Sequence, residues 1–290
     1  MLRPLYLALG ILLLTGCASK EDTREEKGLP VVTVSVAPQA WFIDQIGGEL
    51  VETRIMVPRG SNPEEYDPAP REIASLEESD LYIYTGVLPF EEVWAGHVEG
   101  SQTRTANLAE ILPEKLLFPE GKHEETRGGH AHGDPHFWSS FEGGRFLAQT
   151  TYEELLELLP SDSLVLRERY LKVIEKIEGL REEALNAFGS RDEGKAFLIY
   201  HPSLTAFAQE MGLTQIAVEY EGKEPTPMHL SRIVEEAERL GAKVMLIQKE
   251  FNPENARSIA GEVHAETVEI NPYDYDWEAQ MRLLTEALSK

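Results

Sequence analysis

Short runs rich in Val and Ile alternate with helix-like stretches along this chain, and the alternation occurs twice. In the first half, three runs are expected to form strands: Val31–Val36, Glu52–Val57 and Leu81–Tyr84. Two stretches between them are expected to form helices: Ala40–Ile46 and Pro70–Glu78. Strand, helix and strand at this spacing predict a parallel sheet covered by helices.

The same rhythm returns in the second half of the chain. Four runs are expected to form strands: Ala196–Tyr200, Gln215–Val218, Lys243–Gln248 and Glu266–Ile270. Three stretches are expected to form helices: Ser203–Met211, Pro227–Leu240 and Pro253–Val263. Gly212 and Gly241 stand just past two of these helices, where a left-handed cap favours glycine. The sequence therefore predicts an α/β fold with two lobes that each contain a parallel sheet.

A long helix is expected between the two halves. Asp162–Phe188 contains no proline and only one glycine, and its apolar residues recur at helical intervals. At ~1.5 Å per residue, this helix reaches roughly 40 Å. That length is enough to lie along both lobes, and a stiff connection of this kind restricts hinge opening more than flexible crossovers do.

The first residues carry the pattern of an export signal. Met1–Gly16 contains one positive charge, at Arg3, and an apolar run from Leu5 to Leu14 that leads into a lipobox ending at Cys17. The run is shorter than the about 20 residues that a membrane-spanning helix needs, and an uncleaved signal anchor is the alternative. Cys17 is the only cysteine, so no intramolecular disulfide is possible, and we predict that it carries the lipid.

These features predict the division of the chain. The expected segments are a signal peptide (1–16), a tether (17–28), an N-terminal lobe (29–159), a linker helix (160–189) and a C-terminal lobe (190–290).

The composition limits the possible partners. The chain has 27 Lys and Arg against 51 Asp and Glu, a net charge of −24. This charge argues against nucleic acid or anionic lipid as a partner, because both favour Lys and Arg. It suits a protein that handles cations, although an acidic surface that only promotes solubility gives the same number.

Two isolated histidines are candidate metal ligands. His136 lies in Asp134-Pro135-His136-Phe137-Trp138, and His201 stands at the end of the expected strand Ala196–Tyr200. Ligands of α/β proteins bind at the carboxyl ends of strands. Two imidazoles facing one cleft favour Zn, Mn, Fe or Cu over Mg or Ca. A histidine hydrogen-bonded beneath a loop is the alternative for either residue.

Several short motifs occur in order along the chain. They are Gly60-Ser61-Asn62-Pro63-Glu64-Glu65-Tyr66-Asp67-Pro68-Ala69-Pro70, then Gly86–Glu91 with Trp94, then Asp134–Trp138, then His201-Pro202 with Phe207 and Gly212. Together they resemble the zinc- and manganese-binding lipoproteins of metal-uptake ABC transporters, over most of the chain from Val31 onward. The resemblance implies two α/β lobes joined by one long backbone helix and a metal in the cleft between them. It also implies delivery of the metal to a membrane permease powered by an ATPase, without catalysis.

The resemblance also implies a ligand set. His136 and His201 fall on the family's second and third ligand positions. The first is usually a histidine and is here Glu64, whose carboxylate can still coordinate. The fourth is commonly an acid next to a proline and is here Asn271. An amide oxygen is a weak donor to a transition metal, so Asp274, Glu65 or a water are the alternatives for this fourth place.

Zinc is the metal favoured by this set, with Mn²⁺ or Fe²⁺ as alternatives that would add water.

A separate group, His123, His130 and His132, lies in a stretch of Gly, His and charged residues that cannot bury a core. In the zinc-specific proteins that this chain resembles, such loops are thought to gather zinc near the cleft. A solvated surface loop is the alternative.

Two other functions fit a site with one carboxylate and two histidines. A metal-dependent enzyme is one, although no His-Glu-x-x-His segment is present. An adhesin or surface metal store is the other, and it would retain metal binding without transporter partners.

Overall fold

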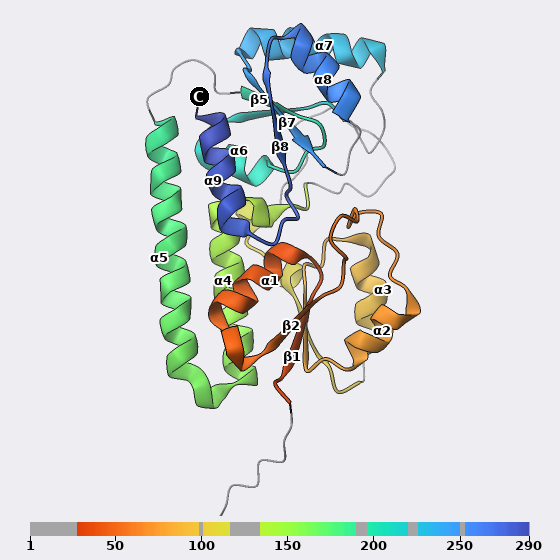
Figure 1. Cartoon of the computed structure of the whole chain (residues 1–290), viewed down its shortest axis with the longest axis vertical. Helices are drawn as coiled ribbons and strands as arrows, with labels where there is room; N and C mark the ends of the chain where they lie inside the picture. The colour runs from red at the N-terminus through yellow and green to blue at the C-terminus, as the bar shows by residue number, and fades with distance from the viewer. Residues whose placement is uncertain are drawn as a thin grey trace, which may run out of the picture.

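The structure is a computed structural model that describes residues 28–98, 101–116, 134–189, 196–219, 226–249 and 253–289. It contains two four-stranded sheets, with strand orders β2-β1-β3-β4 and β6-β5-β7-β8. Figure 1 shows the first sheet in the lower half of the molecule, the second in the upper half, and one long helix beside both. The expected fold class is confirmed. The signal peptide, the tether, Cys17 and the group of His123, His130 and His132 lie outside the described residues.

The first sheet is parallel throughout. Its strands are β1 (Val31–Val34), β2 (Glu52–Ile55), β3 (Leu81–Tyr84) and β4 (Arg104–Asn107). Its helices are α1 (Ala37–Ile46), α2 (Pro70–Glu77) and α3 (Pro89–Val98). The central strand β1 is almost wholly buried, as its run of valines suggests. The edge strand β4 reads Arg-Thr-Ala-Asn and has no buried residue, which explains why the apolar pattern did not predict it.

The second sheet repeats this arrangement. Its strands are β5 (Ala196–Ile199), β6 (Thr214–Ala217), β7 (Val244–Gln248) and β8 (Glu266–Ile270), all parallel. Its helices are α6 (Thr205–Met211), α7 (Pro227–Leu240) and α8 (Pro253–Glu262). Gly212 and Gly241 end α6 and α7 in the left-handed conformation, each with φ of 68°. The predicted glycine caps are therefore confirmed.

Three further helices connect the lobes: α4 (Phe141–Leu158), α5 (Ser163–Phe188) and α9 (Trp277–Leu288). The 26-residue α5 is the predicted long helix. It packs against α1 and α4 from the first half and against α6 and α9 from the second. In Figure 1 it runs along the side of both sheets, so it serves both lobes.

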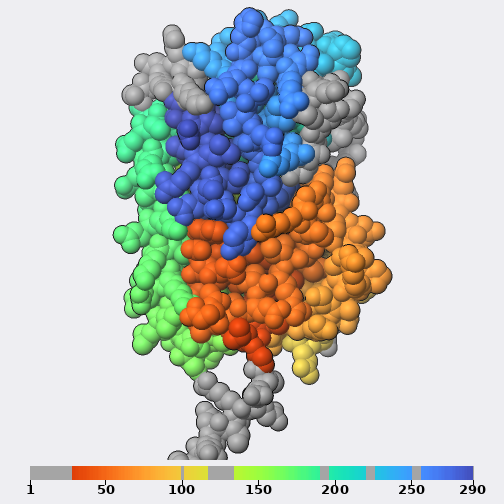
Figure 2. Space-filling model, in the orientation of Figure 1, coloured from red at the N-terminus to blue at the C-terminus, as the bar shows by residue number. Residues whose placement is uncertain are grey.

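One hydrophobic core extends from the first sheet through α4 and α5 to the second sheet. In β5, Phe197 and Ile199 belong to this shared core, whereas Leu198 belongs to a second cluster with residues of α7 and α8. This division follows the pleat, since successive side chains of a strand point to opposite faces. Figure 2 shows the C-terminal half of the chain packed directly on the N-terminal half.

Close packing also joins the lobes around Trp277. Its indole Nε1 donates a hydrogen bond of 2.7 Å to the carbonyl of Trp138. The ring lies over Gly144 of α4, where a Cβ atom would stand only 2.3 Å from it. Glycine at this position thus permits the close approach of α4 and α9. Within the described residues, no helix is both long and apolar enough to span a membrane.

Candidate metal centre

Glu64 lies in the loop between β2 and α2, at the carboxyl end of the first sheet. Its backbone N–H donates to Asn62 Oδ1 at 3.1 Å. Farther along the loop, the Tyr66 hydroxyl donates to the carbonyl of Met56 at 3.3 Å, and its ring packs edge-on against Phe90. These contacts hold the loop against the lobe and leave the Glu64 side chain 27% exposed.

His136 stands just before α4 and is almost completely buried, with 1% of its side chain exposed. Asp134 Oδ1 accepts hydrogen bonds from the backbone N–H of His136 at 2.9 Å and from its Nδ1 at 2.8 Å. Asp134 Oδ2 accepts from the backbone N–H of Thr205 in the second lobe. Burial raises the pKa of Asp134, but these hydrogen bonds outweigh burial and hold the pKa below its usual value. The ionised carboxylate therefore orients the imidazole and directs Nε2 toward Glu64.

His201 follows β5 at the carboxyl end of the second sheet. Gln248 holds its backbone, because its amide accepts from the His201 N–H and donates to the His201 carbonyl. The imidazole Nδ1 lies 2.9 Å from Glu219 Oε2, and Nε2 lies 3.0 Å from Glu64 Oε1. Burial lowers the pKa of His201, but its hydrogen bonds with Glu219 and Glu64 raise it more, to about 10.

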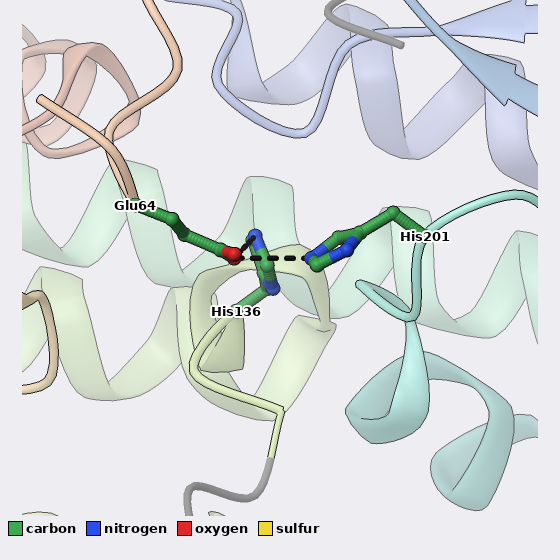
Figure 3. Close-up of side chains that lie close together, drawn as sticks. All are labelled: Glu64, His136 and His201. Carbon is green, nitrogen blue, oxygen red and sulfur yellow. Dashed lines mark hydrogen bonds and ion pairs between the residues drawn. The ribbon is translucent and has the colours of Figure 1, made fainter. Parts of the chain in front are cut away.

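The three side chains converge on one point between the lobes (Figure 3). Each of Glu64, His136 and His201 offers one ligand atom, and these atoms lie within 4.8 Å of one another. The centroids of the two imidazole rings are 5.6 Å apart. Burial raises the pKa of Glu64, but the hydrogen bond with His201 and the pull of both imidazoles lower it below 4.5 overall. Two nitrogens and one anionic oxygen suit zinc, manganese or ferrous iron.

At the predicted fourth ligand position, the side chain of Asn271 contacts its own loop. Asn271 Oδ1 accepts from the backbone N–H of Tyr273 at 3.0 Å, and Asn271 Nδ2 lies 3.4 Å from Asp274 Oδ2. The amide is thus engaged within its own loop, and its role as a ligand stays a prediction. From this loop, the hydroxyl of Tyr273 approaches the site, 2.7 Å from His136 Nε2. Of the described residues, Asp274 and Glu65 are not among the three that offer converging ligand atoms.

Reasoning from the sequence missed the role of the two carboxylates behind the imidazoles. Asp134 was visible only as part of the His136 motif. Glu219 had a usable signal, because it directly follows the expected strand Gln215–Val218, as His201 follows Ala196–Tyr200. In the structure, β5 and β6 pair with Ile199 opposite Ala217. Two residues farther along each strand, this register places His201 beside Glu219. A carboxylate behind a metal-binding histidine fixes the tautomer and raises the basicity of the ligand nitrogen.

Several known proteins are similar to this chain over most of its length. The zinc-binding lipoprotein AdcA of Streptococcus pneumoniae is 22% identical over 93% of this chain and 54% of that protein. The chain thus spans about half the length of AdcA. The high-affinity zinc uptake system protein ZnuA of Bacillus subtilis is 23% identical over 91% of this chain and 86% of that protein. The manganese ABC transporter substrate-binding lipoprotein PsaA of Streptococcus anginosus is 23% identical over 88% of this chain and 84% of that protein.

Solved structures give the same result. The crystal structure of ZnuA superposes with a TM-score of 0.80 at 26% identity, over 90% of this chain and 98% of that chain. A ZnuA deletion mutant with zinc bound superposes with a TM-score of 0.77 at 26% identity, over 90% and 97%. The family described as ZnuA, zinc-uptake complex component A periplasmic, matches residues 32–290. Since this match takes in both sheets, the long helix and all three converging side chains, the chain belongs to the ZnuA family.

Proposed function

We propose that this protein is a lipid-anchored solute-binding protein that captures a divalent transition metal and delivers it to an ABC importer. One observation carries the proposal: Glu64, His136 and His201 bring a carboxylate and two imidazoles from both lobes within 4.8 Å of one another. Each ligand is held by its own loop contacts, so the site is organised before the ion arrives. A preorganised site lowers the cost of binding.

We propose that the metal is bound through Nε2 of each histidine and Oε1 of Glu64. In both rings, Nδ1 faces a carboxylate, Asp134 for His136 and Glu219 for His201. This leaves Nε2 as the nitrogen that faces the site. The fourth place belongs to Asn271, as the family resemblance implies, or to a water.

Zinc is the favoured cargo in this proposal, and Mn²⁺ or Fe²⁺ is the alternative. A set of two nitrogens and one carboxylate suits four-coordinate zinc, and it suits the other two ions when water is added. Relatives named for zinc and a relative named for manganese both match the chain. The histidines at 123, 130 and 132 favour zinc, as a loop that would gather the ion.

The partners in this proposal are a membrane permease and its ATPase. Several relatives are named as ABC transporter lipoproteins, and the sequence supplies Cys17 for a lipid anchor after an export signal. The protein would then act in the cell envelope, either in the periplasm or at the cell surface. The net charge of −24 suits a carrier of cations and not of nucleic acid.

A competitive titration tests the proposal. Protein purified without added metal is analysed for its elements, then stripped and titrated with zinc and manganese. We expect one tight site per chain, with severe loss of binding in His136→Ala and in His201→Ala because each removes a ligand. His97→Ala is the matched control, since His97 lies on α3 and is not one of the converging residues. Retention of the tight site in both ligand variants would contradict the proposal.

A further inference from the structure

The hydroxyl of Tyr273 occupies the position beside His136 Nε2 that the metal would use. Its oxygen lies 2.7 Å from His136 Nε2, and the two ring centroids are 5.2 Å apart. Tyr273 belongs to the loop after β8, in the lobe opposite His136. The contact therefore crosses from one lobe to the other at the metal site.

The loop holds Tyr273 in this position from both sides. Asn271 Oδ1 accepts from the Tyr273 backbone N–H at 3.0 Å. On the other side, Trp138 Nε1 donates to the carbonyl of Pro272 at 2.9 Å, and the Trp138 ring packs against the Tyr273 ring. These contacts fix the Tyr273 side chain so that its hydroxyl points at His136.

A neutral imidazole has one lone pair in the ring plane for bonding. Asp134 accepts the Nδ1–H of His136, so this lone pair is on Nε2. With the ring in this tautomer, the Tyr273 hydroxyl, 2.7 Å away, is the donor to Nε2. A metal ion needs the same lone pair, and the hydrogen bond and the metal–nitrogen bond therefore exclude each other.

We propose that Tyr273 is an internal competitor of the metal, whose hydroxyl must leave His136 Nε2 before the ion can bind there. This inference rests on the proposed function, because it concerns the same site. Tyr273 would lower the affinity for the metal and would link occupancy of the site to the loop Asn271–Asp276. A carrier that must release its ion to a permease gains from such a built-in competitor, since the hydroxyl can replace the departing metal on His136.

In this proposal, the displaced hydroxyl turns into a cavity beside Tyr273. Tyr273 lines a cavity of about 80 Å³ between its own loop and the loop after β2. A water needs only about 10–15 Å³ of such volume. Arg59, Ser61 and Asp274 also line this cavity and provide polar partners for a hydroxyl or a water.

Zinc titration of Tyr273→Phe tests the inference. The variant keeps the ring and removes only the competing hydroxyl, so we expect about three- to tenfold tighter zinc binding, the range of one neutral hydrogen bond. Tyr273→Leu is expected to shift the affinity in the same direction, and it serves if the Phe variant does not fold. Tyr275→Phe is the matched control: it removes a hydroxyl from the same loop, one that bonds Asp44 at 2.7 Å, and should leave the affinity unchanged.

The outcomes separate this inference from the proposed function. Weaker binding by Tyr273→Phe would show that the oxygen supports the bound ion, directly or through water, and would overturn the competitor role. Unchanged binding, or equal tightening in Tyr275→Phe, would also overturn it. Failure of the wild-type protein to bind zinc or manganese would instead refute the proposed function itself. Thermal unfolding of each stripped variant establishes that it is folded before titration.

Discussion

At the scale of single residues, protons and a metal ion would compete for the same atoms of the candidate site. Glu64 Oε1 accepts from His201 Nε2 at 3.0 Å and lies 3.4 Å from His136 Nε2. On the other side of the ring, Glu219 Oε2 lies 2.9 Å from His201 Nδ1 and stabilises the protonated imidazole. The same carboxylates that would attract a cation therefore also stabilise the proton that it has to replace.

This balance predicts a pH dependence of metal binding. The pKa of His201 is raised from 6.5 to about 10, so the metal-free ring is protonated at neutral pH, and Nε2 must lose its proton to bind an ion. The affinity should therefore rise with pH below about 10, by up to about tenfold per pH unit for one proton. Calorimetric titration at pH 7.5 in buffers of different ionisation enthalpy should show release of about one proton from this site.

Glu219→Gln provides the control for this dependence. The neutral amide removes the strongest favourable contact of the His201 imidazolium, which lowers the pKa of the ring. The variant should release fewer protons and show a shallower rise of affinity with pH. Proton release that is the same in both proteins would contradict the assignment of the proton to His201.

The candidate ligands could be predicted from the sequence because each follows a recognisable strand or motif. Glu64, His136 and His201 all occupy such positions. The approach of Tyr273 to His136 could not be predicted, since these residues are 137 positions apart and meet only when the lobes pack together. Asn271 is a different case, because an Asn side chain readily accepts from the backbone N–H two residues farther on, and Asn271 Oδ1 does so here.

At the scale of elements, apolar periodicity predicted most strands and helices but missed the strand β4 and the helices α3, α4 and α9. The edge strand β4 is polar, and α4 has Gly143 and Gly144 in its first turn, a pair that suggests a loop in sequence. The structure explains why position 144 requires glycine. At Gly144, α4 passes so close to Trp277 that no side chain fits.

Gly144→Ala should destabilise the protein. Alanine is the better helix former, by about 1 kcal/mol, but its Cβ would meet a Trp277 ring that is buried and held by a hydrogen bond to Trp138. Overpacking of this kind costs about 1–3 kcal/mol, so the clash should dominate. Urea unfolding of the metal-free variant measures the difference.

Gly179→Ala is the matched control for that substitution. Gly179 lies in the middle of α5, and a Cβ there would meet no atom within 4 Å. We expect this variant to gain about 0.5–1 kcal/mol, because only helix propensity changes. Stabilisation by both substitutions would show that the contact between Gly144 and Trp277 can relax.

At the scale of the whole molecule, the two lobes share one core and one candidate metal site. The alternation of strands and helices predicted two sheets, and the stretch without proline predicted the helix between them. Their relative position depends on packing that no periodicity encodes, such as the aromatic cluster of Trp41, Phe42 and Trp277 beside α5. The candidate metal site lies where this packing brings the carboxyl ends of both sheets together.

Metal removal should therefore affect the stability of the entire molecule. An ion that binds only the folded protein stabilises it by about 4 kcal/mol at a thousandfold excess over Kd, which corresponds to roughly 8–16 °C in Tm for a chain of this size. Because Glu64 and His136 come from one lobe and His201 from the other, and because the main core is continuous, the shift should appear in a single unfolding transition. Differential scanning calorimetry with zinc and then with EDTA measures it, and His201→Ala should show almost no shift. Two separate transitions, of which only one responds to zinc, would mean that a single lobe holds the ion.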